Sequence, residues 1–326
     1  MSTVHTTQTD PALATVPHHE PAWTSLGRYG VQNLIVALMQ VLGWATLLTV
    51  MDQWAWPLAI RIGAGALFCI MMQGVFTMLH EFCHRNANAN PRLNYLIGWV
   101  TCTLFGTAPT FLQVQHWGHH RRNRTASERG EFIHSGEGAI GKGLRYYFAI
   151  LGGIWLACFM FPLLVPLLPY SVSRKLTLDA RFNSFSEAFN EFGRGQWRRM
   201  QAEGLGLWCF TLVLLILGPW HWQTLLWAYG TFAFTWSSLQ WVYHLHTPIH
   251  VVEGAYNLRL PTSMRRLFLN FNYNLTHHRH PAMPWQELYG NSDPLETQPL
   301  WYRYLLVFRL PVPFPENFTS LEKRYF

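Results

Sequence analysis

The sequence predicts an all-α integral membrane protein with four transmembrane helices, two partial or interfacial apolar segments and a cytoplasmic cap that carries clustered histidines. Three observations predict this fold class. Half of the 326 residues are hydrophobic and only 13% are charged, whereas about a quarter of an ordinary soluble domain is charged. Aromatic residues reach 16%, with 16 Trp, which is typical of side chains at membrane–water interfaces. Several apolar stretches are long enough to cross a bilayer.

Residues 1–25 are predicted to be a disordered cytoplasmic tail, and residues 26–326 a single membrane-embedded domain. The tail is polar and lacks the positive region and apolar core of a signal peptide. The five Cys are scattered and form no CxxC pair, so we expect a reducing compartment and no disulfide framework. The net charge of +7 is assigned to cytoplasmic loops of a membrane protein, and no nucleic-acid partner is expected.

A first hairpin is predicted from two apolar runs, Val31–Met51 and Leu58–Leu79, joined by an aromatic turn at residues 54–57. This hairpin delivers His80 to the membrane surface. The next apolar run, Leu93–Leu112, contains two Gly and a Pro. If it crossed fully, the first two histidine clusters would lie on opposite sides, so we expect it to dip in and return, or to lie along the interface.

The second half of the chain also contains apolar runs separated by polar, basic stretches. Two basic stretches, residues 121–145 and 174–199, are placed in the cytoplasm by the positive-inside rule. The apolar run between them, Tyr146–Pro169, then has to be a second segment that does not cross. Leu205–Leu217 and Thr224–Tyr243 form a second hairpin. The result is a multi-pass protein with both termini inside and all three histidine clusters on the cytoplasmic face.

The histidines form three clusters, each beside an apolar stretch: HEFCH at 80–84, HWGHH at 116–120 and NLTHHRHP at 274–281. Histidines three and four residues apart share one face of a helix. Gln240 and His244 lie at the same spacing near the end of the last span. Imidazole is the commonest neutral metal ligand and suits iron, copper and zinc. Eight or more imidazoles are too many for one ion, which indicates a two-metal site.

This pattern resembles the integral-membrane fatty acid desaturase and hydroxylase superfamily, which is similar from about His80 to Leu288. The family shares HxxxH, HxxHH and a final (H/Q)xxHH, with a further His late in the last span. The resemblance implies a non-haem di-iron centre that uses O₂ as co-substrate. The metal ligands that it implies are His80, His84, His116, His119, His120, His244, His277 and His278.

The third cluster departs from the family pattern, because Asn274 stands where the family usually has His or Gln. An amide oxygen can bind iron or hold a bound water, so Asn274 is a weak ligand, a neighbour of the ligands, or neither. His280 could supply the missing imidazole instead. Gln240 occupies a place where some relatives use an Asn that reaches iron through water.

The resemblance also implies an oxidation of an unactivated C–H bond in a fatty acyl or related lipid chain. Desaturation is the commonest outcome in the superfamily, and hydroxylation and decarboxylation to a terminal alkene use the same ligands. Arg121, Arg122 and Arg124 are candidates for binding the substrate head group, or are ordinary cytoplasmic positive charges. Because the chain shows no haem, iron–sulfur or flavin motif, we expect a separate electron donor of the ferredoxin, rubredoxin or cytochrome b5 type.

Two other classes of function fit parts of the sequence. HEFCH satisfies the HExxH motif of a zinc protease, with Glu81 as the base. That interpretation leaves the other two clusters without a role. A metal transporter would place its ligands within the spans, whereas these histidines lie at the ends of the apolar stretches.

Overall fold

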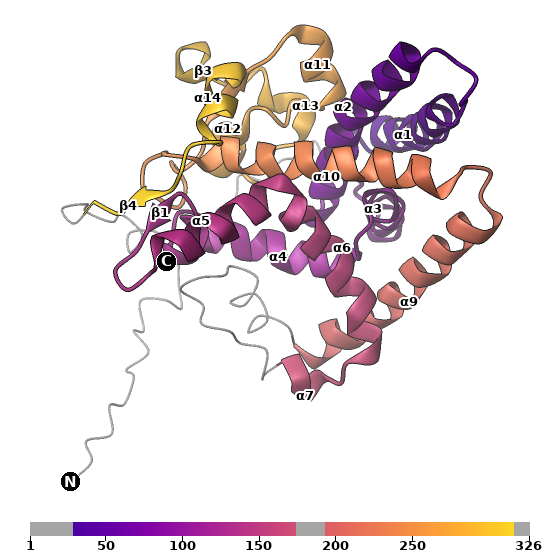
Figure 1. The fold of residues 1–326 in the computed structure, drawn as a ribbon, viewed down its shortest axis with the longest axis horizontal. Coiled ribbons are helices and arrows are strands. Elements are labelled where there is room, and N and C mark those ends of the chain that lie inside the picture. The colour runs from indigo at the N-terminus through magenta and orange to yellow at the C-terminus, as the bar shows by residue number, and fades with distance from the viewer. Residues whose placement is uncertain (1–28, 174–192, 316–326) are drawn as a thin grey trace.

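The computed structural model describes residues 29–173 and 193–315, which are mostly helical (Figure 1). The predicted tail, residues 1–25, lies outside the described residues, and so do residues 174–192. The longer helices are α1 (Gly30–Met51), α2 (Leu58–Cys83), α3 (Pro91–Phe105), α4 (Pro109–Arg122), α5 (Ala139–Phe148), α6 (Ile154–Leu164), α9 (Arg194–Leu217) and α10 (Trp222–His244). The shorter ones are α7 (Tyr170–Ser173), α11 (Thr262–Leu267), α12 (Asn274–Arg279), α13 (Trp285–Leu288) and α14 (Leu300–Leu306).

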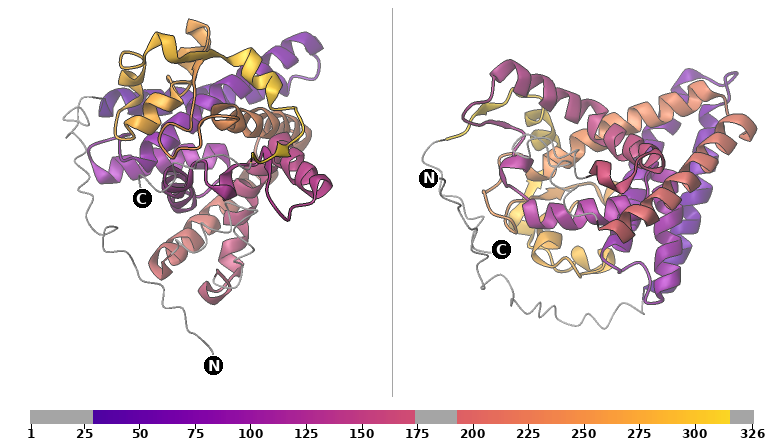
Figure 2. Two further views of the ribbon diagram at one scale, coloured as in Figure 1. Left: turned by 90° about the vertical axis from the view of Figure 1, so that its left-hand side faces the viewer. Right: turned by 90° about the horizontal axis from the view of Figure 1, so that it is seen from below.

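The strands in the described part of the chain are short and parallel. β1 (Phe132–Ile133) pairs with β4 (Val312–Pro313), and β2 (Asn257–Arg259) pairs with β3 (Thr297–Pro299). They join segments of the C-terminal part to earlier loops. In Figures 1 and 2 the elements of the C-terminal part form a cap at the end of the molecule opposite the two hairpin loops. The predominance of helices, four of which in the described residues are long and apolar enough to cross a membrane, confirms the predicted all-α membrane fold class.

The first hairpin, α1 and α2, forms as predicted, and both helices are long and apolar enough to cross a membrane. Tryptophans in its turn are exposed. Asp52, at the end of α1, accepts hydrogen bonds from the backbone N–H of His221 and from the hydroxyl of Thr224. These bonds tie the turn of the first hairpin to the turn between α9 and α10. His221 therefore lies at the end of the molecule away from the cap.

The predicted partial segment Leu93–Leu112 forms two helices, α3 and α4, whose axes are bent by 92°. Gly106 ends α3 with a φ of 91°, a left-handed conformation that glycine adopts without strain. Pro109 then starts α4 at a position where a helix needs no N–H. The bend carries the second histidine cluster back beside the end of α2.

Glu203 of α9 fixes the start of α4. Its buried carboxylate accepts hydrogen bonds from the backbone N–H and the hydroxyl of Thr110, each at 2.8 Å, and from the hydroxyl of Tyr95 at 2.9 Å. A negative charge at this position also interacts favourably with the helix dipole. The position of the second cluster therefore depends on a residue about 90 positions later in the chain.

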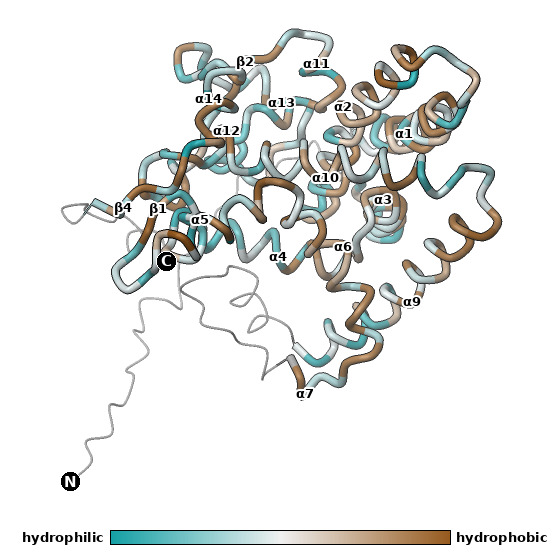
Figure 3. The backbone as a smooth tube through the Cα atoms, viewed as in Figure 1, coloured by the Kyte–Doolittle hydropathy of each residue, from teal (hydrophilic) through white to brown (hydrophobic). Residues whose placement is uncertain are grey.

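Four helices in residues 29–173 and 193–315 are long and apolar enough to cross a membrane, and they are not the four that the sequence analysis predicted. Ala139–Leu167 is long and apolar enough to cross, although we predicted a partial segment there, and Gly152 breaks its helical geometry with a φ of 128°. By contrast, α10, which we predicted to cross, is not apolar enough to count as a membrane span. Its polar side chains bond to neighbouring segments, since Ser237 accepts from the N–H of Trp155 and Ser238 bonds to Tyr304. α10 runs through the centre of the molecule, and polar and apolar residues alternate along it (Figure 3).

Candidate metal centre

Five histidines from three helices converge at the cap end of α2. Their ligand atoms all lie within 4.8 Å of one another. The Nε2 atoms of His84 and His116 are 2.6 Å apart, and His120 Nε2 is 3.0 Å from the Nε2 atoms of both His116 and His277. His80 completes the group, with its Nε2 3.0 Å from that of His277. The structure thus brings together residues that lie up to 197 positions apart.

The chemistry of this first group fits a bound cation. Several Nε2 atoms that face one another cannot all be satisfied by sharing protons, whereas lone pairs directed at one point suit a metal ion. Burial lowers the pKa of His84 to about 3 and holds the pKa of His277 well below its usual value. The imidazoles are therefore neutral at physiological pH, which is the form that binds metal.

A second group lies beside the first and consists of His119, His244 and His278, whose ligand atoms are also within 4.8 Å of one another. His119 donates its Nδ1 hydrogen to the Glu128 carboxylate at 2.6 Å, and His244 donates its own to the carbonyl oxygen of Gly254 at 2.8 Å. Such bonds fix the tautomer and leave Nε2 free to bind a metal. Sequence reasoning did not identify Glu128 or Gly254, because neither lies in a histidine cluster.

The consecutive histidines of the second and third clusters divide between the two groups. His119 belongs to the second group and His120 to the first; His278 belongs to the second and His277 to the first. Neighbouring residues on a helix point about 100° apart, so each HH pair can serve two adjacent ions. All eight histidines predicted as ligands thus fall into two groups of five and three.

The three additional candidates have different surroundings. Asn274 is buried, and its Oδ1 has no hydrogen-bond partner in the described part of the chain. Gln240 lines a cavity beside the histidines and belongs to neither group. His280 ends α12 with an exposed side chain and joins neither group. The helix stops there, so His280 does not point along the face that carries His277.

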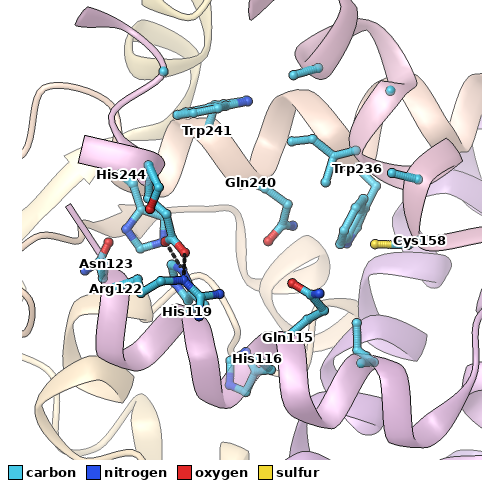
Figure 4. Close-up of a pocket in the computed structure, with 18 of the residues that line it drawn as sticks. Gln115, His116, His119, Arg122, Asn123, Cys158, Trp236, Gln240, Trp241 and His244 are labelled. Carbon is cyan, nitrogen blue, oxygen red and sulfur yellow. Dashed lines mark hydrogen bonds and ion pairs between the residues drawn. The ribbon is translucent and has the colours of Figure 1, made fainter. Parts of the chain in front are cut away.

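A cavity of about 440 Å³ adjoins both groups (Figure 4). Histidines of both groups form one part of its wall. The rest of the wall has an apolar part and a polar part, and the sequence analysis singled out only Arg122 of the residues given next. The apolar residues include Phe76, Leu79, Leu112, Ile154, Ala157 and Trp236, and the polar ones include Gln115, Arg122, Glu128, Lys142 and Arg145.

The three arginines predicted to bind a head group are not equivalent. Arg122 lines the cavity, 3.6 Å from Glu128. Arg121 is exposed and does not line it. Arg124 is fully buried in an ion pair of 2.7 Å with Glu131, also away from the cavity. Its side chain packs beside Gly254, where an added Cβ would lie 2.3 Å from Arg124 Cγ, so it lies against the loop whose carbonyl orients His244.

The zinc-protease alternative finds no support in this geometry. Glu81 is buried, does not line the cavity, and accepts a hydrogen bond from the backbone N–H of Trp285 at 3.3 Å. A catalytic base has to reach its substrate. His80 and His84 also share their group with three histidines from other clusters.

The comparison with known families supports the resemblance seen in the sequence. The family model described as fatty acid desaturase matches residues 54–308. That range includes every histidine of both groups. No curated protein matches the chain significantly. The chain therefore belongs to the fatty acid desaturase family, and it is an integral membrane oxidoreductase whose histidine clusters can hold metal.

Proposed function

We propose that the protein is an O₂-dependent di-iron oxidase that acts on an unactivated C–H bond of a fatty acyl or related lipid chain, as a desaturase. The observation that carries this proposal is the division of eight histidines into two adjacent groups beside an apolar cavity. A bound pair of irons would supply O₂ activation, with electrons from a separate ferredoxin-, rubredoxin- or cytochrome b5-type donor.

The first group would hold one iron with five imidazoles, and the second group would hold the other with three. The smaller set leaves room for a further ligand. The buried Oδ1 of Asn274, which lies one helical turn before His277 and His278, is suited to bind metal directly or to hold a water there. We do not assign His280 to the centre.

The chain's own residues position the substrate and exclude water. The apolar wall accepts a hydrocarbon chain by burying its surface. His116 and His119 lie where that wall meets the metal groups, so a chain in the cavity presents its C–H bonds to them (Figure 4). Which reaction follows depends on the position of the reacting carbon to within about an ångström. We further propose that the centre opens on the cytoplasmic face, because basic residues are concentrated in the loops beside it.

Metal and lipid analysis test this function together. Detergent-purified protein is expected to contain about two irons per chain, and lipids of expressing cells to contain a new alkene. His116→Ala should lose iron from the first group and all turnover. His221→Ala, at the opposite end of the molecule, is the matched control and should keep both. One zinc per chain with unchanged lipids would refute the di-iron proposal.

A further inference from the structure

Two glutamine amides face each other across the cavity, from α4 and from α10 (Figure 4). They belong to Gln115 and Gln240. The Nε2 atom of each is buried and has no hydrogen-bond partner among the residues that the structure describes. The indole Nε1 atoms of Trp236 and Trp241, which also line the cavity, are two more buried donors without such partners. The cavity therefore contains hydrogen-bond donors whose capacity the protein leaves unused.

The charged side chains of the cavity are already paired. Glu137, which is buried, lies 3.2 Å from the ammonium group of Lys142 and 3.1 Å from the guanidinium group of Arg145. Glu128 lies beside Arg122 and accepts from His119. A buried donor left without an acceptor is costly. The unused donors thus require an acceptor, and the cavity is where a substrate would supply it.

We propose that Gln115 and Gln240 bind an acceptor oxygen of the substrate, the carboxylate or carbonyl oxygen of an acyl chain, beside the metal groups. This inference rests on the proposed function and names the part of the substrate that the cavity recognises. It places the polar end of the substrate deep in the cavity, rather than at the paired basic residues.

The positions of the glutamines determine which carbon is oxidised. Gln115 directly precedes His116, and Gln240 lies one turn, about 6 Å of helix rise, before His244. An oxygen held by these amides is therefore only a few bonds from a carbon facing the metal groups. The hydrocarbon tail would extend along apolar residues such as Leu112 and Ala157. Oxidation is thus expected near the oxygen-bearing end of the chain and not at its middle.

Ligand binding tests this inference without requiring turnover. The iron-loaded protein is kept in detergent under nitrogen without an electron donor, and the Kd is measured for dodecanoic acid, methyl dodecanoate and dodecane. Gln115→Leu and Gln240→Leu remove the donors and nearly keep the volume. Each should weaken binding of the acid about tenfold and of the ester about fivefold, because a hydrogen bond to a charged group contributes more than one to a neutral group. Binding of dodecane should stay unchanged or become tighter.

Gln113→Leu is the matched control, because Gln113 lies on the same helix, does not line the cavity and donates to the carbonyl of Cys83. It should bind all three probes as the wild type does. Iron content identifies any variant with a damaged centre, and Gln240→Met then replaces the Leu variant. If both cavity variants bind the acid within twofold of the wild type, or if the wild type binds dodecane as tightly as the acid, the inference is wrong.

The two proposals can fail separately. Wild-type protein that binds the acid through the glutamines but holds no iron would refute the di-iron function and leave the recognition site standing. Wild-type protein that oxidises a chain at its middle, with unchanged activity in both cavity variants, would keep the function and refute the site.

Discussion

Removing the Glu128 carboxylate should release one metal ion and leave the other in place. Glu128 accepts the Nδ1 hydrogen of His119 at 2.6 Å and is mostly shielded from solvent. Without it, the His119 ring loses its fixed tautomer and orientation. Partners of this kind usually contribute a factor of 10–100 to metal affinity, or about 1.4–2.8 kcal/mol. The affected group has three imidazoles, whereas the other has five, so the loss should be confined to the smaller group.

The assay is iron content per chain after equilibration with increasing concentrations of a chelator. In Glu128→Ala, one iron should leave at chelator concentrations about 10–100 times lower than in the wild type, giving a plateau near one iron. Glu128→Gln should be intermediate, because an amide oxygen still accepts a hydrogen bond but a neutral bond is about half as strong.

Glu137→Gln provides the matched control for this series. Glu137 is also a buried carboxylate near the cavity, but its partners are Lys142, Arg145 and the backbone N–H of His134. It should retain both irons as the wild type does. If Glu128→Ala also keeps both irons at wild-type chelator concentrations, or loses both together, the argument that Glu128 orients a ligand of one group is refuted.

Three further outcomes follow from packing and burial. Gly98→Ala should lower the free energy of unfolding by about 1–3 kcal/mol, because a Cβ there would lie 2.3 Å from the Phe82 ring, whereas Gly63→Ala, which meets no atom within 4 Å, should be neutral or slightly stabilising in thermal unfolding. Glu203→Leu should lower Tm by several degrees, because it leaves the buried N–H and hydroxyl of Thr110 without their acceptor; an unchanged Tm would contradict the role of this carboxylate. Removing metal with a chelator should lower Tm, because a metal ion that binds only the folded protein stabilises it; equal Tm values with and without metal would contradict metal binding by the histidine groups.

The sequence by itself determined the apolar segments, the histidine clusters and their family. These features are local: spacing of three and four residues places histidines on one helix face whatever the rest of the chain does. The eight residues proposed as ligands were implied by the resemblance of these clusters to the family motifs. Four helices of the described residues are long and apolar enough to cross a membrane, as many as predicted, but they are not the same four. The charge of the flanking loops led us to treat Tyr146–Pro169 as a partial segment, whereas α10 is the helix that lacks the hydropathy of a span.

Only the tertiary structure decided how those local features combine. The bend at Gly106 brings the second cluster to the first, and Glu203, from a distant helix, fixes the start of α4. The division of the histidines into groups of five and three, the role of Glu128 and the position of Gln115 opposite Gln240 all depend on contacts between segments far apart in the chain. Such contacts depend on the packing of whole helices, and no short sequence pattern specifies them.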